Sequence, residues 1–125
     1  MNGTYLRFVA GRRFLSLRAV FALAAIALAP AVHAAIVSSS GTVAVILSYA
    51  SFGGGDFAFR ISTQPAGCES GFWLSQQQPG FKSSVAFILQ ARATGEAVLV
   101  GGDNTQLWSG SGDHWCKVDF VGTPF

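Results

Sequence analysis

One stretch decides the fold class: residues 79–95, PGFKSSVAFILQARATG. Its large apolar residues recur at the spacing of a helix that buries one face; they are Phe81, Val85, Ile88 and Leu89. Proline suits the first positions of a helix and glycine suits the residue just past its end, and Pro79 and Gly95 stand at these points. The stretch therefore predicts one helix of about 14 residues, packed on a sheet.

On both sides of this stretch, side chains alternate as they do in strands with one buried face. Extended segments are expected at 42–49, 57–62, 68–74, 97–100 and 115–121, with 106–108 as a candidate for one more. Glycine-rich runs at 53–56 and 101–104 are interpreted as two separate turns. The order of three strands, one helix and two strands predicts a mainly β domain with one helix. A small OB-like Greek-key barrel is the favoured architecture, and an α+β sandwich is the alternative.

Residues 1–34 have the composition of a secretory signal peptide. A head with four arginines precedes an uncharged, alanine-rich run at 19–32. Small residues around the Ala34–Ala35 bond suit a signal peptidase. A membrane anchor is the alternative, but a spanning helix needs about 20 apolar residues and this run has 14. We therefore expect cleavage between Ala34 and Ala35, export to the periplasm or beyond, and no stable membrane span afterwards.

Removal of this leader reverses the net charge. All six acidic residues follow Ala34, but only four of the eight lysines and arginines do, so the charge changes from +2 to −2. Nucleic-acid binding needs a basic stripe that offsets phosphate charge. No such stripe exists in 35–125, which excludes that class of partner. We expect a serine-rich flexible arm at 35–40 and a single domain at 41–125.

Cys68 and Cys116 are the only cysteines. In an oxidising compartment such a pair is expected to form a disulfide. A loop of this length gives about 4 kcal/mol of stabilisation in the chain-entropy model. A redox or metal pair is the alternative. It lacks a Cys-x-x-Cys motif, and 35–125 contains one histidine, so we expect neither a metal nor another cofactor.

Three tryptophans are candidates for a ligand surface. If the two cysteines point inward, alternation along the strands turns Trp73 and Trp115 outward. Trp108 borders the glycine- and serine-rich loop that ends at His114. Large aromatic rings at surface positions often mark contact sites. The favoured interpretation is that the tryptophans belong to the core, since a bulge at Gly71 could turn Trp73 inward. The alternative is that these three rings and His114 border a ligand surface.

Catalytic arrangements are weakly supported. His114 follows Ser109, Ser111 and Asp113, but nucleophilic catalysis needs a base held beside its serine, and neighbours in a loop rarely hold that geometry. Asp56 and Asp103 each follow a glycine pair, as turn residues do. Asp103 and Asp113 match no calcium loop. The prediction is that the chain is not an enzyme.

Several short motifs support a family resemblance. They are Cys68–Leu74, Pro79–Lys82, Ala91–Gly95, Leu107–Ser111 and the closing Cys116. Their order resembles small exported bacterial proteins of unassigned function. The layout over 41–121 is similar to that of the binding subunits of AB5 toxins, especially the subtilase-cytotoxin type. The resemblance implies an OB fold, assembly into rings and binding of cell-surface glycans, but it carries over no sugar-contacting residue.

These observations together predict an exported, non-catalytic binding domain. Homo-oligomers are one of its expected assembly states. Its partner is expected to be a glycan or another exported protein. The alternative is a periplasmic inhibitor or an envelope-structural protein that acts by protein contact. A small hydrolase that uses His114 ranks last.

Overall fold

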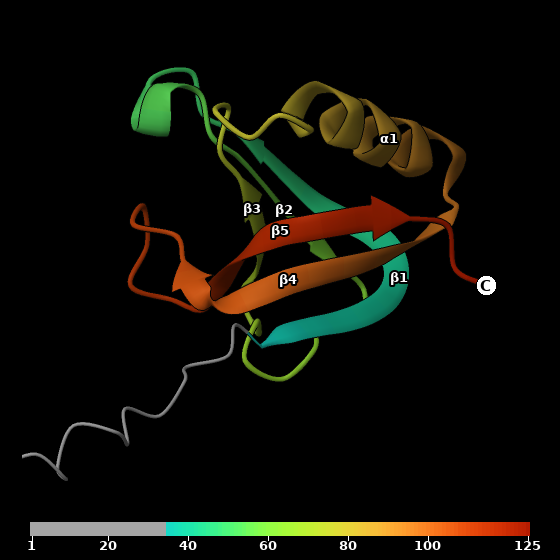
Figure 1. The fold of residues 1–125 in the computed structure, drawn as a ribbon. Helices are drawn as coiled ribbons and strands as arrows, with labels where there is room; N and C mark the ends of the chain where they lie inside the picture. Colours follow the sequence, from blue (N-terminus) through green and yellow to red (C-terminus); the bar gives the residue numbers. More distant parts are fainter. Residues whose placement is uncertain (1–34) are drawn as a thin grey trace, which may run out of the picture. The chain divides into compact units, whose positions relative to one another are not determined.

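The computed structural model describes residues 35–125, in which five strands surround a main core and one α-helix packs against them (Figure 1). The expected signal peptide, with Ala34 of its cleavage site, lies outside the described residues. The elements are β1 (Ile36–Ser48), a 3-10 turn η1 (Phe52–Gly54), β2 (Phe57–Ile61), β3 (Gly71–Leu74), α1 (Phe81–Thr94), β4 (Ala97–Leu107) and β5 (Trp115–Gly122).

The five strands form one mixed sheet that closes on itself in the order β1–β2–β3–β5–β4. Closure depends on β1, which pairs with β4 along its first half and with β2 along its second half. The pairing register shifts between Val43 and Val45, and such a bulge bends a strand so that it can serve two neighbours. The only parallel pairing between described strands joins β3 to β5.

The described part is therefore mainly β with one helix placed between β3 and β4, as predicted, and it is consistent with a small OB-like fold. The strands belong to one ring and do not form the layers of the alternative sandwich. Among residues 35–125, no helix has the length and hydropathy needed to cross a membrane.

The prediction of a flexible arm at 35–40 is wrong. Ile36–Ser40 form the beginning of β1 and pair residue by residue with Leu99–Asp103. Serine content suggested mobility, but main-chain hydrogen bonds do not depend on side-chain type. The serines alternate between the two faces of the strand, where small polar side chains are tolerated.

The prediction of a turn at 101–104 is also wrong, since β4 continues through it to Leu107. The two glycines serve close packing instead. A Cβ at Gly101 would collide with the Phe120 ring, and one at Gly102 would lie 2.8 Å from Phe72. By contrast, the glycines at 53–55 form a turn as expected, with φ values of 62°, 79° and 116°.

Helix α1 closely matches its prediction. It ends at Thr94, and Gly95 adopts the left-handed conformation, with φ 75°, expected of a residue that terminates a helix. Ile88 and Ala91 are buried, and Phe81, Val85 and Phe87 pack against the core. Leu89 was expected on the buried stripe, but it is exposed.

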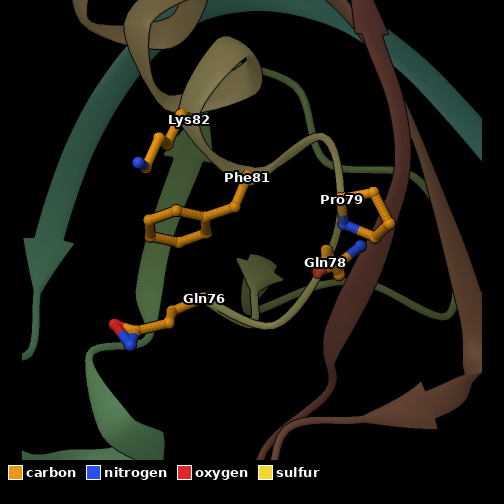
Figure 2. Close-up of a pocket in the computed structure, with 5 residues that line it drawn as sticks. All are labelled: Gln76, Gln78, Pro79, Phe81 and Lys82. Atoms are coloured by element: carbon orange, nitrogen blue, oxygen red, sulfur yellow. The ribbon is translucent and has the colours of Figure 1, made fainter.

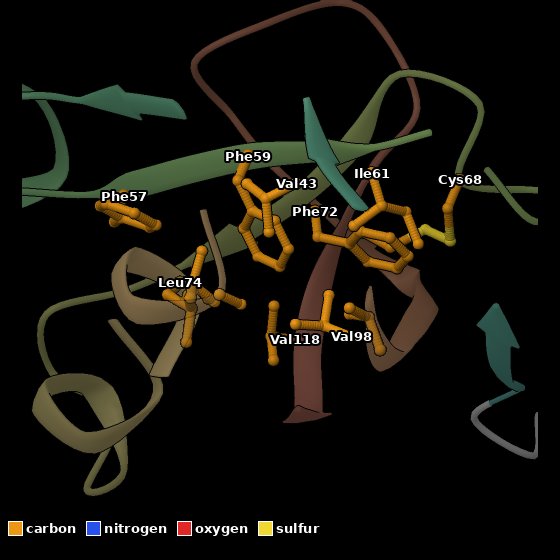
Figure 3. Packing of buried hydrophobic residues seen from close by; sticks show 13 residues of the cluster. Val43, Phe57, Phe59, Ile61, Cys68, Phe72, Leu74, Val98 and Val118 are labelled. Carbon is orange, nitrogen blue, oxygen red and sulfur yellow. A yellow bond between two sulfur atoms is a disulfide. The ribbon is translucent and has the colours of Figure 1, made fainter. Parts of the chain in front are cut away.

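The core lies inside the ring and under α1 (Figure 3). Its largest fully buried side chains include Phe59, Phe72, Leu74 and Ile88. The disulfide between Cys68 and Cys116 is formed, as predicted, and both of its residues are fully buried in this cluster.

Candidate functional site

The tryptophans lie on the side of the sheet that alternation predicts. Phe72 and Cys116 belong to the main core, whereas their neighbours Trp73 and Trp115 belong to a second cluster with Trp108 and Ala58. This second cluster lies on the outer face of the sheet. The parity argument is therefore confirmed.

The interpretation that the tryptophans belong to the core holds for Trp108 and Trp115, so the alternative of three surface rings is wrong. Trp108 is 4% exposed and Trp115 is 9% exposed. Trp108 packs against Tyr49, Phe52 and Trp115, with ring centroids 4.9, 5.4 and 6.1 Å away. Its Nε1–H donates a hydrogen bond of 2.8 Å to Asp56 Oδ2. These contacts bury Trp108 and Trp115 on the outer face of the sheet, where the two residues form a second core.

Trp73 is the tryptophan that stays half-exposed. Its Nε1–H donates to the main-chain carbonyl of Gln106 at 3.2 Å, and Lys117 Nζ lies 5.9 Å from its ring centroid. Gln106 also joins Lys117 to Asp103, since its amide accepts from Lys117 and donates to Asp103. Three polar side chains joined by hydrogen bonds, those of Lys117, Gln106 and Asp103, thus lie beside Trp73. We call these four residues the Trp73 row.

Asp103 is the anchor of that row. Hydrogen bonds from the side chain and main chain of Thr105, followed by one from Gln106, hold the pKa of Asp103 below its ordinary value. The Asp103 carboxylate therefore accepts its hydrogen bonds from residues of its own strand, Thr105 and Gln106. Within residues 35–125 there is no cluster of three or more metal-ligating side chains.

His114, which directly precedes Trp115, contacts a carboxylate through its side chain. Its Nδ1 is 3.3 Å from Glu69 Oε2, and the two side chains are 60% and 62% exposed. The main-chain N–H groups of Gly67 and then of Glu69 itself, with a smaller effect of His114, hold the pKa of Glu69 below its ordinary value. The hydroxyl of Ser111 donates to Asp113 instead of facing the imidazole. His114 and Ser111 therefore contact different carboxylates, those of Glu69 and Asp113.

The structure contains a hollow that the sequence did not indicate (Figure 2). It has a volume of about 500 Å³ and lies between the segment after β3 and the first turn of α1. Its lining residues are Gln76, Gln78, Pro79, Phe81 and Lys82. In Figure 2, the side chains of Gln76, Phe81 and Lys82 point to one side of the hollow, while Gln78 and Pro79 border the other.

The chemistry of this hollow is that of a site for a polar molecule with an apolar face. The Phe81 ring supplies an apolar wall, Gln76 supplies an amide, and Lys82 supplies an ammonium group. Neither Gln76 nor Lys82 uses its side chain in a hydrogen bond or ion pair within residues 35–125. Three consecutive glutamines before Pro79 were the available sequence signal, but on their own they indicated only a break between two elements.

No family model, curated protein or solved structure matches this chain.

Proposed function

We propose that this protein is an exported, non-catalytic binding domain and that its ligand is a glycan held in the hollow lined by Gln76, Phe81 and Lys82. The observation that carries the proposal is the hollow itself. It combines an aromatic wall with an amide and an ammonium group that are free to bind a ligand.

The size and lining of the hollow suit one or two sugar rings. Small-molecule sites usually measure about 300–1,000 Å³ and place a few polar groups around apolar walls. A sugar ring has an apolar face of C–H groups and a rim of hydroxyls. The Phe81 ring can pack against that face, while Gln76 and Lys82 donate hydrogen bonds to the hydroxyls.

The hollow is held in shape by Gln78. Its Nε2 donates to the Val118 carbonyl at 2.9 Å, and its Oε1 accepts from the Ser75 main-chain N–H at 2.8 Å. These bonds tie the segment after β3 to β5. Binding to a preformed site costs little conformational entropy in the protein, so the ligand binds more tightly.

Export is supported by the leader-like residues 1–34 and by the formed disulfide, because disulfides persist in oxidising compartments. The resemblance to toxin binding subunits supports both a glycan ligand and ring assembly. Light scattering on the purified protein tests the assembly, and a strictly monomeric protein would contradict it.

A glycan array tests the proposed ligand. Protein recovered from expression of the full chain is labelled and applied to neutral and charged glycans, and each positive is measured by calorimetry. We expect Gln76→Ala and Lys82→Ala together to weaken binding at least tenfold. Gln77→Ala is the matched control, because this exposed neighbour does not line the hollow. A blank array, or binding unchanged in the double variant, would overturn the proposal.

Protein contact is the second candidate function, and the Trp73 row favours it. Leu107, which directly follows Gln106, is 43% exposed, and the half-exposed Trp73 ring, beside Lys117, binds the Gln106 carbonyl. Aromatic and aliphatic side chains of this kind form the centres of protein interfaces. Binding of an exported protein that Trp73→Ala weakens, and Gln76→Ala does not, would place the partner at the Trp73 row.

A further inference from the structure

The first half of β1 has a neighbouring strand on one side only. Residues 36–42 pair with β4, whereas β2 pairs with β1 from Val43 onward. In Figure 1 this half of β1 runs along the lower border of the ring, next to β4. Within residues 35–125, no strand pairs with the other side of residues 36–40. The ring of strands therefore has an open border at residues 36–40, which we call the β1 edge.

Hydrogen bonds at the two ends of the β1 edge show which main-chain groups point out from it. The N–H of Asn104 on β4 donates to the Ala35 carbonyl at 3.3 Å, so Ala35 faces β4. Thr42 faces the opposite way, since its N–H donates to Ser62 Oγ at 3.1 Å and its carbonyl accepts from the Ser62 N–H at 2.9 Å. Main-chain groups alternate between the two sides along an antiparallel strand. The residues whose N–H and C=O groups point away from β4 are therefore Ile36, Ser38 and Ser40.

The main-chain groups that point out from the β1 edge have no hydrogen-bond partner within residues 35–125. Ser38 and Ser40 are exposed, and Ile36 is 44% exposed. A row of exposed main-chain donors and acceptors is a template for pairing with another strand. Proteins commonly protect such a row with charged side chains, proline or a bulge. Residues 36–40 contain no charged residue and no proline, and the bulge of β1 lies beyond them, after Val43.

The charge and size of the side chains at the β1 edge suit a second copy of the same strand. In a two-fold contact the same surface meets itself, so a charged side chain at its centre would lie near a like charge, which destabilises paired strands. The side chains of residues 35–42 carry no charge. Those at the centre of the edge are serines, whose small hydroxymethyl groups leave room for a second main chain to approach. The edge is therefore compatible with its own copy in both shape and charge.

We propose that two copies of this protein pair through the β1 edge, with the two strands antiparallel and Ser38 on the two-fold axis. In this register Ser38 lies opposite its counterpart, and Ile36 lies opposite Ser40 of the second copy. Every main-chain N–H and C=O group that points out from the edge then has a partner. The contact occupies the edge of both copies, so it joins two copies and no more. It is separate from the glycan hollow and from the ring assembly, which needs two different surfaces.

Proline at position 38 tests the pairing and leaves the ring of strands intact. The Ser38 N–H points away from β4, and proline is tolerated on an edge strand when its missing N–H faces solvent. In analytical ultracentrifugation the unaltered protein should associate in pairs. Ser38→Pro should raise the dissociation constant of the pair at least about tenfold, because each copy loses one main-chain donor, and Ser38→Ala, the matched control, should leave it unchanged. Unaltered protein that does not pair at any concentration, or pairing that Ser38→Pro leaves unchanged, would overturn the proposal.

NMR on the unaltered protein tests the register. In a mixture of isotope-labelled and unlabelled copies, a filtered NOE should join the Hα atoms of Val37 and Ser39 across the contact, since the Cα atoms of such a pair lie about 4.5 Å apart. Absence of this NOE in the associated protein would contradict the register.

Hydrogen exchange decides if Ser38→Pro fails to fold. The amides of Ser38 and Ser40 should exchange more slowly as the protein concentration rises. Exchange that does not depend on concentration, or that slows only when another exported protein is added, would overturn pairing with a second copy. Gln76→Ala with Lys82→Ala should leave the pair unchanged, so failure of the glycan proposal and failure of this one are distinguishable.

Discussion

Arg92 on α1 donates a hydrogen bond from Nη1 to the main-chain carbonyl of Val43, at a distance of 2.8 Å. Val43 lies at the register shift of β1, next to the point where the strand changes its pairing from β4 to β2. A bulge leaves part of the ladder unpaired. The guanidinium supplies a donor at that point, so the helix stabilises the bend that allows the ring of strands to close.

Replacement of Arg92 by methionine should lower the free energy of unfolding by about 1 kcal/mol, because methionine keeps much of the apolar stem and loses the hydrogen bond. Urea denaturation measures the change. Lys82→Met on the same helix is the control and should shift stability by less than about 0.5 kcal/mol. Equal effects of the two substitutions would show that the bond to Val43 adds nothing.

Replacement of Cys68 and Cys116 by serine should cost about 4 kcal/mol, since the unfolded chain loses its cross-link. The difference is measured by comparing the midpoint and slope of urea unfolding for the variant and the oxidised protein. Reduction of the unaltered protein should give a similar loss. A variant as stable as the oxidised protein would show that the small core suffices without the bridge.

The two glycines of β4 should respond differently to alanine. At Gly102 the new Cβ would lie 2.8 Å from Phe72 and 3.0 Å from the Cys116 Cβ, in a fully buried region, so overpacking should cost about 1–3 kcal/mol. At Gly101 the obstacle is the Phe120 ring, which is partly exposed and can swing aside. Thermal denaturation should therefore show the larger loss for Gly102→Ala, and the reverse order would contradict this account of the packing.

Acid should destabilise the protein partly through Asp103. Hydrogen bonds from Thr105, followed by one from Gln106, lower the pKa of this carboxyl in the folded state. A lowered folded-state pKa contributes stability that is present above the unfolded-state pKa, about 3.9, and lost as the pH falls through the folded value. Asp103→Asn should therefore lower the melting temperature at neutral pH and show a smaller further loss on acidification.

The control for this measurement is Asp119→Asn, because Asp119 is an exposed aspartate without a side-chain hydrogen bond in the described part of the chain. Its melting temperature should follow that of the unaltered protein across the acid range. If Asp103→Asn also follows the unaltered curve, the hydrogen bonds of Asp103 do not contribute to acid sensitivity.

Local patterns were sufficient for the helix, the disulfide and the parity of the tryptophans. Helix limits depend on nearby residues such as Gly95, whose left-handed conformation ends α1. Alternation depends on strand geometry alone, so Trp73 and Trp115 lie on the face opposite Phe72 and Cys116 as predicted. Neither inference requires knowing which other segment of the chain packs against the helix or against that face of the sheet.

The sequence by itself determined a mainly β domain with one helix between its third and fourth strands and a disulfide between Cys68 and Cys116. Only the tertiary structure decided that residues 36–40 are a strand, that Gly101 and Gly102 sit in the middle of one, and that Trp108 is buried. Each of these depends on a partner distant in the chain: β4, Phe120 with Phe72, and Asp56. Burial and close packing are properties of pairs of segments, and a local pattern describes only one member of each pair.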